Sequence, residues 1–161
     1  MDIYFERYGN GASVPRPGDV EVIAEAMNRL IPRLNPRSPR DVATPLRLNR
    51  ALGGITDLFL ARDRDCSDRV VGMAILVRGD KVTAYMCHME DVVVEPGYEG
   101  QHIATTLVKM VQRVVKSDGN YRLNCSSRDA AAVYIKLGFQ VVAEGRTTFL
   151  EWDATGEVQT D

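Results

Sequence analysis

The chain has 161 residues, a length that fits one domain with a single hydrophobic core. It is 45% hydrophobic and 26% charged, which is typical of globular proteins and argues against general disorder. No stretch reaches the roughly 18 apolar residues of a membrane span, and a net charge of -2 gives no overall attraction to nucleic acid. Three cysteines without CxxC spacing, and a start unlike a signal peptide, predict a reduced, cytoplasmic protein that contacts no membrane.

The N-terminal half predicts one strand, two helices and three more strands. The first helix opens at Pro17 and is expected to stop at Pro32, while Pro45 weakens the second helix. A tight turn expected at Gly79-Asp80 makes the last strands an antiparallel meander. The predicted strands are 3–8, 56–61, 70–77 and 82–94, and the predicted helices are 17–31 and 40–51.

The C-terminal half predicts alternating helices and strands, with a frayed tail from 154 onward. The predicted helices are 101–117 and 128–137, and the predicted strands are 121–125, 139–143 and 147–152. The order β-α-α-β-β-β-α-β-α-β-β predicts an α/β (α+β) fold. We expect a mixed, mostly antiparallel sheet of about seven strands, with about four helices on both faces. The strands flanking the long helix should be adjacent and parallel, because they form a βαβ unit.

The segment 92–104 joins a predicted buried strand directly to the start of the long helix. Unpaired backbone N–H groups and the helix dipole at such a junction suit a pyrophosphate. A plain connecting loop fits the same geometry, so the loop alone leaves both interpretations open.

Two motifs identify a family resemblance. Glu99-Gly100-Gln101-His102-Ile103-Ala104 is similar to the acyl-CoA-binding motif [Q/R]-x-x-G-x-[G/A] of the GNAT superfamily of N-acyltransferases, with Glu99 and His102 departing from the pattern. The run 130–139 resembles that superfamily's A-x-x-x-Y-x-K-x-G-F ending, and the element order matches over 1–152. The resemblance implies one GNAT-like N-acetyltransferase domain over 1–153, followed by the tail 154–161. It implies an acyl-CoA-dependent N-acetyltransferase with acetyl-CoA as cosubstrate. A GNAT-fold binding or host-interaction protein without catalysis is the alternative.

The resemblance also implies where the cosubstrate binds. Main-chain N–H groups at the start of the long helix would hold the pyrophosphate, and the preceding strand would offer backbone groups to the pantetheine. The residues implied are Gly100, Gln101, His102, Ile103, Ala104 and Thr105 for the pyrophosphate, and Val92, Val93 and Val94 for the pantetheine.

The resemblance implies that Tyr134 is the general acid that protonates the leaving thiolate. The alternative is that Tyr134 is only an aromatic side chain that covers the core. The run 88–94 is similar to the H-x-E-D-V-V-V run of glucosamine-6-phosphate N-acetyltransferases. It implies Glu90 as base or amine positioner, with His88 and Asp91 binding the acceptor. Strict alternation would place His88, Glu90, Val92 and Val94 on one face and Asp91 on the other. An ion pair of the two acids with arginines, or a core histidine, would also explain these residues.

The segment 28–50 carries six arginines and one acid, Asp41, a net charge of +5. We expect Arg33 and Arg37 to bind an anionic acceptor, because guanidinium groups bind phosphate or carboxylate bidentately. A solvated face or a protein or nucleic-acid contact is the alternative. No metal is expected, since the chain has only two histidines and no cluster with zinc spacing. The amine acceptor, small or macromolecular, and a homodimer are left open.

Overall fold

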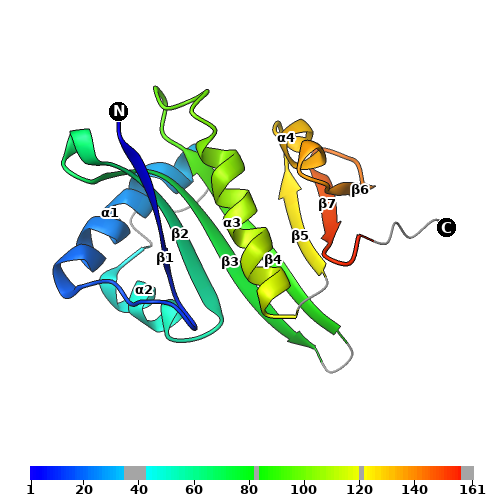
Figure 1. Ribbon diagram of the computed structural model, residues 1–161, viewed down its shortest axis with the longest axis horizontal. Helices are drawn as coiled ribbons and strands as arrows, with labels where there is room; N and C mark the ends of the chain where they lie inside the picture. The colour runs from blue at the N-terminus through cyan, green and yellow to red at the C-terminus, as the bar shows by residue number, and fades with distance from the viewer. Residues whose placement is uncertain (35–42, 82–83, 120–121, 157–161) are drawn as a thin grey trace.

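The computed structural model describes residues 1–34, 43–81, 84–119 and 122–156. A seven-stranded sheet runs through the molecule in the order β1-β2-β3-β4-β5-β7-β6 (Figure 1). Neighbours are antiparallel except β4 and β5, which are parallel as the βαβ argument predicts. The strands are β1 Ile3–Tyr8, β2 Thr56–Asp63, β3 Arg69–Lys81, β4 Ala84–Val94, β5 Arg122–Ser127, β6 Gln140–Ala143 and β7 Thr148–Asp153. The helices are α1 Pro17–Leu34, α2 Pro45–Leu52, the 3-10 turn η1 Arg64–Cys66, α3 Ile103–Ser117 and α4 Ala131–Lys136.

Helices cover both faces of the sheet, as expected, and create two hydrophobic cores (Figure 1). Alternate residues of β2 divide between them: Phe59 and Ala61 pack with α3, whereas Leu58 and Leu60 pack with α1 and α2. Successive strand residues point to opposite faces, so one strand supplies both cores. No helix within the described residues has the length and apolarity needed to cross a membrane.

The predicted limits of α1 and α2 were wrong because of two prolines. α1 continues through Pro32 to Leu34, so that proline interrupts only the last turn of the helix. α2 begins at Pro45, the position where a missing N–H costs nothing, and the Thr44 side chain caps it by accepting from the Arg47 amide at 3.3 Å. Ala43 and Thr44 are not helical, and residues 40–42 lie outside the described ranges.

The expected turn at Gly79-Asp80 was also wrong. Both residues belong to β3, where they face Met86 and Tyr85 of β4. α4 is shorter than predicted, because Arg128 to Ala130 lead into the helix through a loop in which the Ala130 amide donates to Ser127 Oγ. Of the predicted frayed tail, Thr155 bonds back to the Asp153 carboxylate, and 157–161 lie outside the described residues.

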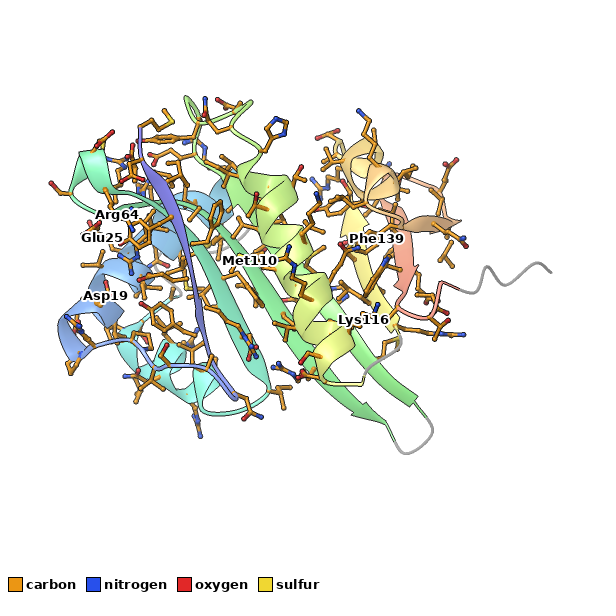
Figure 2. All side chains as sticks on the ribbon, viewed as in Figure 1. Asp19, Glu25, Arg64, Met110, Lys116 and Phe139 are labelled. Atoms are coloured by element: carbon orange, nitrogen blue, oxygen red, sulfur yellow. The ribbon has the colours of Figure 1, made fainter. Side chains whose placement is uncertain are left out.

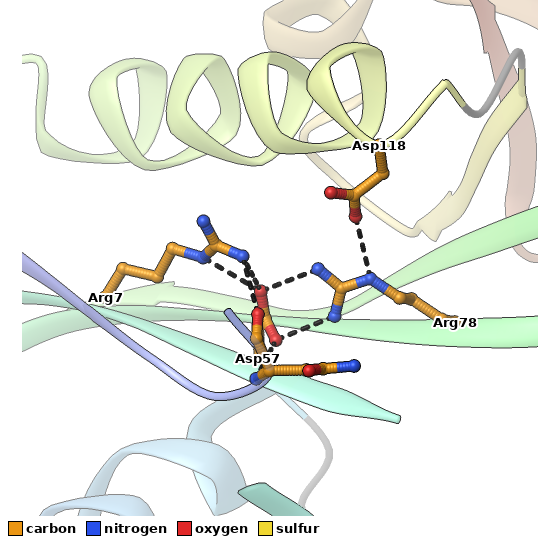
Figure 3. Close-up of polar contacts among 5 residues, drawn as sticks. Arg7, Asp57, Arg78 and Asp118 are labelled. Atoms are coloured by element: carbon orange, nitrogen blue, oxygen red, sulfur yellow. Dashed lines mark hydrogen bonds and ion pairs between the residues drawn. The ribbon is translucent and has the colours of Figure 1, made fainter. Parts of the chain in front are cut away.

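A buried carboxylate ties three strands and α3 together (Figure 3). Asp57 on β2 is fully buried and pairs with Arg7 of β1 and Arg78 of β3, both at 2.7 Å. Arg78 also pairs with Asp118, just after α3, at 2.9 Å. Burial pushes the pKa of Asp57 up, but the two guanidinium groups outweigh burial and hold that pKa below its ordinary value.

Candidate active site

The sheet opens between β4 and β5. The described pairing of these strands covers only Met86, Cys87 and His88 of β4, opposite Arg122 to Asn124 of β5. Beyond that point a cavity of about 470 Å³ lies among β4, β5 and α4. His88, Glu90 and Asp91 line it from β4, and Tyr134 lines it from α4. The structure thus brings together four residues that the sequence placed in the site.

A bulge changes the direction of the β4 side chains within this site. Met73 of β3 faces Val93, but Ile75 faces Glu90, so β4 carries one residue more than β3 over this stretch. Asp91 takes up the extra residue with φ of +50°, a left-handed conformation that aspartate adopts more readily than most residues. The strict alternation expected from the sequence was therefore wrong beyond Glu90: Val92 and Val94 pack with the α3 core, and Val93 packs with α1 and α2.

His88 is held between two polar side chains. Its Nδ1 contacts Asn124 Oδ1, its register partner on β5, and its Nε2 lies 3.6 Å from Glu90 Oε1. An Nδ1 proton that bonds to Asn124 leaves Nε2 facing the carboxylate. His88 is half-buried and lines the cavity, so it is not a fully enclosed core histidine. Sequence reasoning gave Asn124 no role, and only the β4–β5 register points to it.

Glu90 and Asp91 form an acidic pair. Burial first, and then the neighbouring charge of Glu90, raise the pKa of Asp91 above its ordinary value. Arg29 and Arg69 both pair with Glu95. Arg33 is exposed and lines the cavity, whereas Arg37 lies outside the described residues.

Tyr134 both packs in the core and faces the cavity. The residue is only 7% exposed, and its ring meets the ring of Phe139, which is labelled in Figure 2, edge-on at 5.6 Å between centroids. Burial, with a smaller contribution from Cys125, raises the pKa of Tyr134 above its ordinary value. The phenol therefore keeps its proton at neutral pH, as a general acid must.

The loop before α3 has the backbone form that its motif requires. Gly100 has φ of +77°, and His102, at the position of the motif's glycine, also has a positive φ, +57°. α3 starts at Ile103 rather than at Gln101, and its helical bonding begins with the Thr106 amide donating to the His102 carbonyl at 2.9 Å. The amides of Ile103 to Thr105 therefore belong to the first turn, where backbone donors have no partner inside the helix. Glu99 turns back, and its carboxylate accepts from the Gly97 amide at 2.6 Å.

Glu95 anchors this loop to both sides of the molecule. It accepts from Arg29 of α1 at 2.5 Å and from Arg69 of β3. Burial raises the pKa of Glu95, but Arg69 and Arg29 outweigh burial and hold the pKa below its ordinary range. Its backbone also fixes the loop, because the Glu95 amide donates to the Val71 carbonyl and the Tyr98 amide donates to the Glu95 carbonyl.

A second, mostly apolar cavity of about 390 Å³ lies between the sheet and helices α1 and α2. Met27, Ile31, Leu48 and Leu58 line it together with Glu90 and Asp91, so the two cavities meet at the acidic pair. The sequence did not indicate this cavity, because its apolar residues fit the helix and strand patterns of an ordinary core.

The described ranges contain no group of three or more metal-ligating side chains. Cys87 and Cys125 are buried, and burial raises the pKa of the Cys125 thiol to about 12, while Cys66 is exposed on η1.

Comparison with known proteins identifies the family. The family model described as "Acetyltransferase (GNAT) domain" matches residues 55–141, from directly before β2 into β6. The glucosamine 6-phosphate N-acetyltransferase of Trypanosoma brucei brucei is 31% identical over 109 residues, which is 65% of this chain and 72% of the relative.

Two solved structures from Arabidopsis thaliana share the fold. Its glucosamine-6-phosphate N-acetyltransferase superposes with a TM-score of 0.71 at 16% identity, covering 90% of this chain and 96% of that chain. NAA60 in complex with acetyl-CoA superposes with a TM-score of 0.71 at 12% identity, covering 96% and 100%. The family match, the open β4–β5 junction and the loop before α3 agree: the chain belongs to the GNAT acetyltransferase family of acyl-CoA-dependent N-acetyltransferases.

Proposed function

We propose that the chain transfers an acetyl group from acetyl-CoA to an amine by direct attack within a ternary complex. The observation that carries this proposal is the cavity at the β4–β5 opening, because it joins the acidic pair of β4 to Tyr134 of α4. A group that accepts the amine proton and a group that protonates the leaving thiolate thus border one space.

The cosubstrate would lie along β4 and the start of α3. The amides of Gly100 to Thr105, together with the helix dipole, would bind the pyrophosphate. Beyond His88 the edge of β4 has no described pairing with β5, so backbone groups of Val92, Val93 and Val94 are placed to bond to the pantetheine as an added strand does. This arrangement would bring the thioester to the opening between the strands.

In the proposed reaction the neutral amine nitrogen attacks the thioester carbonyl carbon. Glu90, directly or through a water molecule, accepts the proton that the nitrogen loses, and Asp91 and His88 position the amine. The carbon–sulfur bond then breaks, and the Tyr134 hydroxyl protonates the departing thiolate to give free CoA and the amide. The buried, high-pKa Cys125 thiol gives no support to a covalent cysteine intermediate.

We also propose that one domain, 1–153, carries the activity, since β7 ends at Asp153. The Trypanosoma relative makes glucosamine-6-phosphate one candidate acceptor, and a phosphate of that kind is what Arg33 and Arg37 were expected to bind. A homodimer stays a prediction.

Calorimetry with acetyl-CoA tests the cofactor site. Ala104→Val places a larger side chain on the first turn of α3 and should weaken acetyl-CoA binding by about tenfold or more. Lys109→Val, on the exposed side of the same helix, is the matched control and should bind as the wild type does. Equal binding by Ala104→Val would remove this loop from the site. Binding of acetyl-CoA without CoA release over a panel of amines would favour a non-catalytic binding protein.

A further inference from the structure

The apolar cavity under α1 and α2 is placed to receive part of the acceptor. It shares Glu90 and Asp91 with the cavity at the β4–β5 opening. A molecule whose amino group lies at the acidic pair can therefore extend its remaining atoms into this second space. With the cosubstrate on the thioester side, the space under α1 and α2 is open to the acceptor's body.

The described residues that line this cavity are mainly apolar. Met27 and Ile31 of α1 face Leu48, Ala51 and Leu52 of α2, and Leu58, Ile75 and Val77 form the floor. Leu52 and Leu58 are 3% and 1% exposed, so they belong to the core behind the cavity. The cavity is thus an opening in the hydrophobic core, and apolar groups that enter it are removed from water.

Besides the acidic pair, the described polar residues that line this cavity are Asn28, Arg47 and Thr56. Asn28 already donates to the Ala43 carbonyl and accepts from the Ala43 amide, both at 2.8 Å. Arg47 is exposed on α2, and Thr56 stands at the start of β2. A buried hydroxyl that finds no partner lowers affinity by about tenfold, so several sugar hydroxyls would be strongly unfavourable here.

The acidic pair gives the cavity its polarity at one end. Two adjacent carboxylates attract a cation, and both Glu90 and Asp91 line this end of the cavity. An ammonium group at this end and hydrocarbon beyond it match the cavity in both charge and polarity.

We propose that the acceptor is a primary amine with an apolar body, held with its nitrogen at Glu90 and Asp91 and its hydrocarbon among Met27, Leu48, Leu58 and Ile75. This inference rests on the proposed acetyl transfer. It names an acceptor class different from the amino-sugar phosphate of the Trypanosoma relative.

A series of linear alkylamines from methylamine to hexylamine tests the proposal, with CoA release as the measurement. We expect kcat/KM to rise by about threefold to fourfold for each added methylene until the cavity is full. Butylamine and aminopropanol differ only by a terminal methyl in place of a hydroxyl, and aminopropanol should react about tenfold more slowly or worse. Glucosamine-6-phosphate should be a poorer acceptor than butylamine.

Two variants locate the effect in the cavity. Ala51→Leu fills part of it and should lower kcat/KM for butylamine by about tenfold, leaving methylamine and the Kd of acetyl-CoA unchanged. Arg50→Leu adds the same side chain at the neighbouring exposed position and should change neither rate. Met27→Ala enlarges the cavity and should move the optimum to a longer amine, which keeps the test valid if Ala51→Leu fails to fold.

The outcomes separate this inference from the proposed function. Faster reaction of glucosamine-6-phosphate or aminopropanol than of butylamine would overturn the apolar acceptor and leave acetyl transfer intact. If none of the amines causes CoA release, the proposed acetyl transfer to such amines is wrong. Calorimetry of butylamine with the CoA-bound protein then tests whether the cavity binds the amine. Butylamine binding that is weakened by Ala51→Leu would support an apolar amine site, and the absence of butylamine binding would overturn that site.

Discussion

His88 and Asn124 face each other at the last paired position of β4 and β5, with the imidazole Nδ1 against the amide oxygen. This contact sits where the two strands part, so it fixes the imidazole at the mouth of the cavity. Because the amide oxygen accepts, the proton is kept on Nδ1, and Nε2 faces Glu90.

Asn124→Ala should therefore lower kcat/KM for the amine by about threefold to tenfold, the worth of one hydrogen bond. The Kd of acetyl-CoA should not change, because Asn124 is not part of the loop before α3. Steady-state kinetics and calorimetry measure the two quantities. Asn49→Ala, on the exposed surface of α2, is the control. An unchanged kcat/KM in Asn124→Ala would remove the positioning role.

Tyr134→Phe should lower kcat by about 10²-fold to 10⁴-fold, since it removes the proton donor and keeps the ring. Its edge-on contact with Phe139 is preserved, so Tm and acetyl-CoA affinity should match the wild type. Tyr4→Phe, on β1, removes a hydroxyl that donates to the Asp68 carboxylate and should leave kcat unchanged. Full activity of Tyr134→Phe would show that another group, or water, protonates the thiolate.

His102→Gly should raise the free energy of unfolding by about 1 kcal/mol, because a β-carbon is unfavourable at a positive φ. Acetyl-CoA binding should persist, since the backbone amides of the loop are retained. Lys109→Gly, in the regular part of α3, should lower the free energy of unfolding by about 1 kcal/mol. Urea unfolding of both variants measures whether the free energy of unfolding rises for His102→Gly and falls for Lys109→Gly. If both were destabilised equally, the left-handed conformation of His102 would cost nothing.

Glu95→Gln should lower the free energy of unfolding at pH 7 by about 1–2 kcal/mol, since Arg29 and Arg69 lose their charged partner. The folded-state pKa of Glu95 lies below its unfolded value, so this stabilisation is complete above the unfolded pKa of about 4.3. It is lost as the pH falls through the lower folded-state pKa. Unfolding curves of wild type and variant should thus converge in acid. Glu144→Gln, at an exposed position, is the control and should not change the free energy of unfolding at pH 7 or in acid. If Glu95→Gln were less stable than the wild type by the same amount at both pH values, the ionised carboxylate would not be the cause.

Local patterns predicted most of the fold. Alternation and helical spacing located every strand and every α-helix with shifted limits but missed the 3-10 turn η1, and the βαβ rule gave the parallel β4–β5 pair. The long helix was expected to begin at Gln101, and α3 begins shortly after it, at Ile103. These features depend on short stretches of sequence, so one sequence is sufficient to read them.

Features that depend on distant residues could not be predicted. Arg29 was counted toward an anion site, but its partner Glu95 comes 66 residues later. Asn124 reaches His88 only through the register of two strands separated by α3. The bulge at Asp91 depends on β3, because period-two alternation carries no sign of an added residue.

That bulge makes the length of β4 as important as its composition. Loss of one residue between Glu90 and Val93 would restore regular pairing with β3 and exchange the faces of the valines that follow. Val92 and Val94 would leave the α3 core, and the edge offered to a pantetheine would shift by one amide. Exchange among β-branched residues at these valines preserves the edge, whereas insertion or deletion of a single codon in this stretch does not.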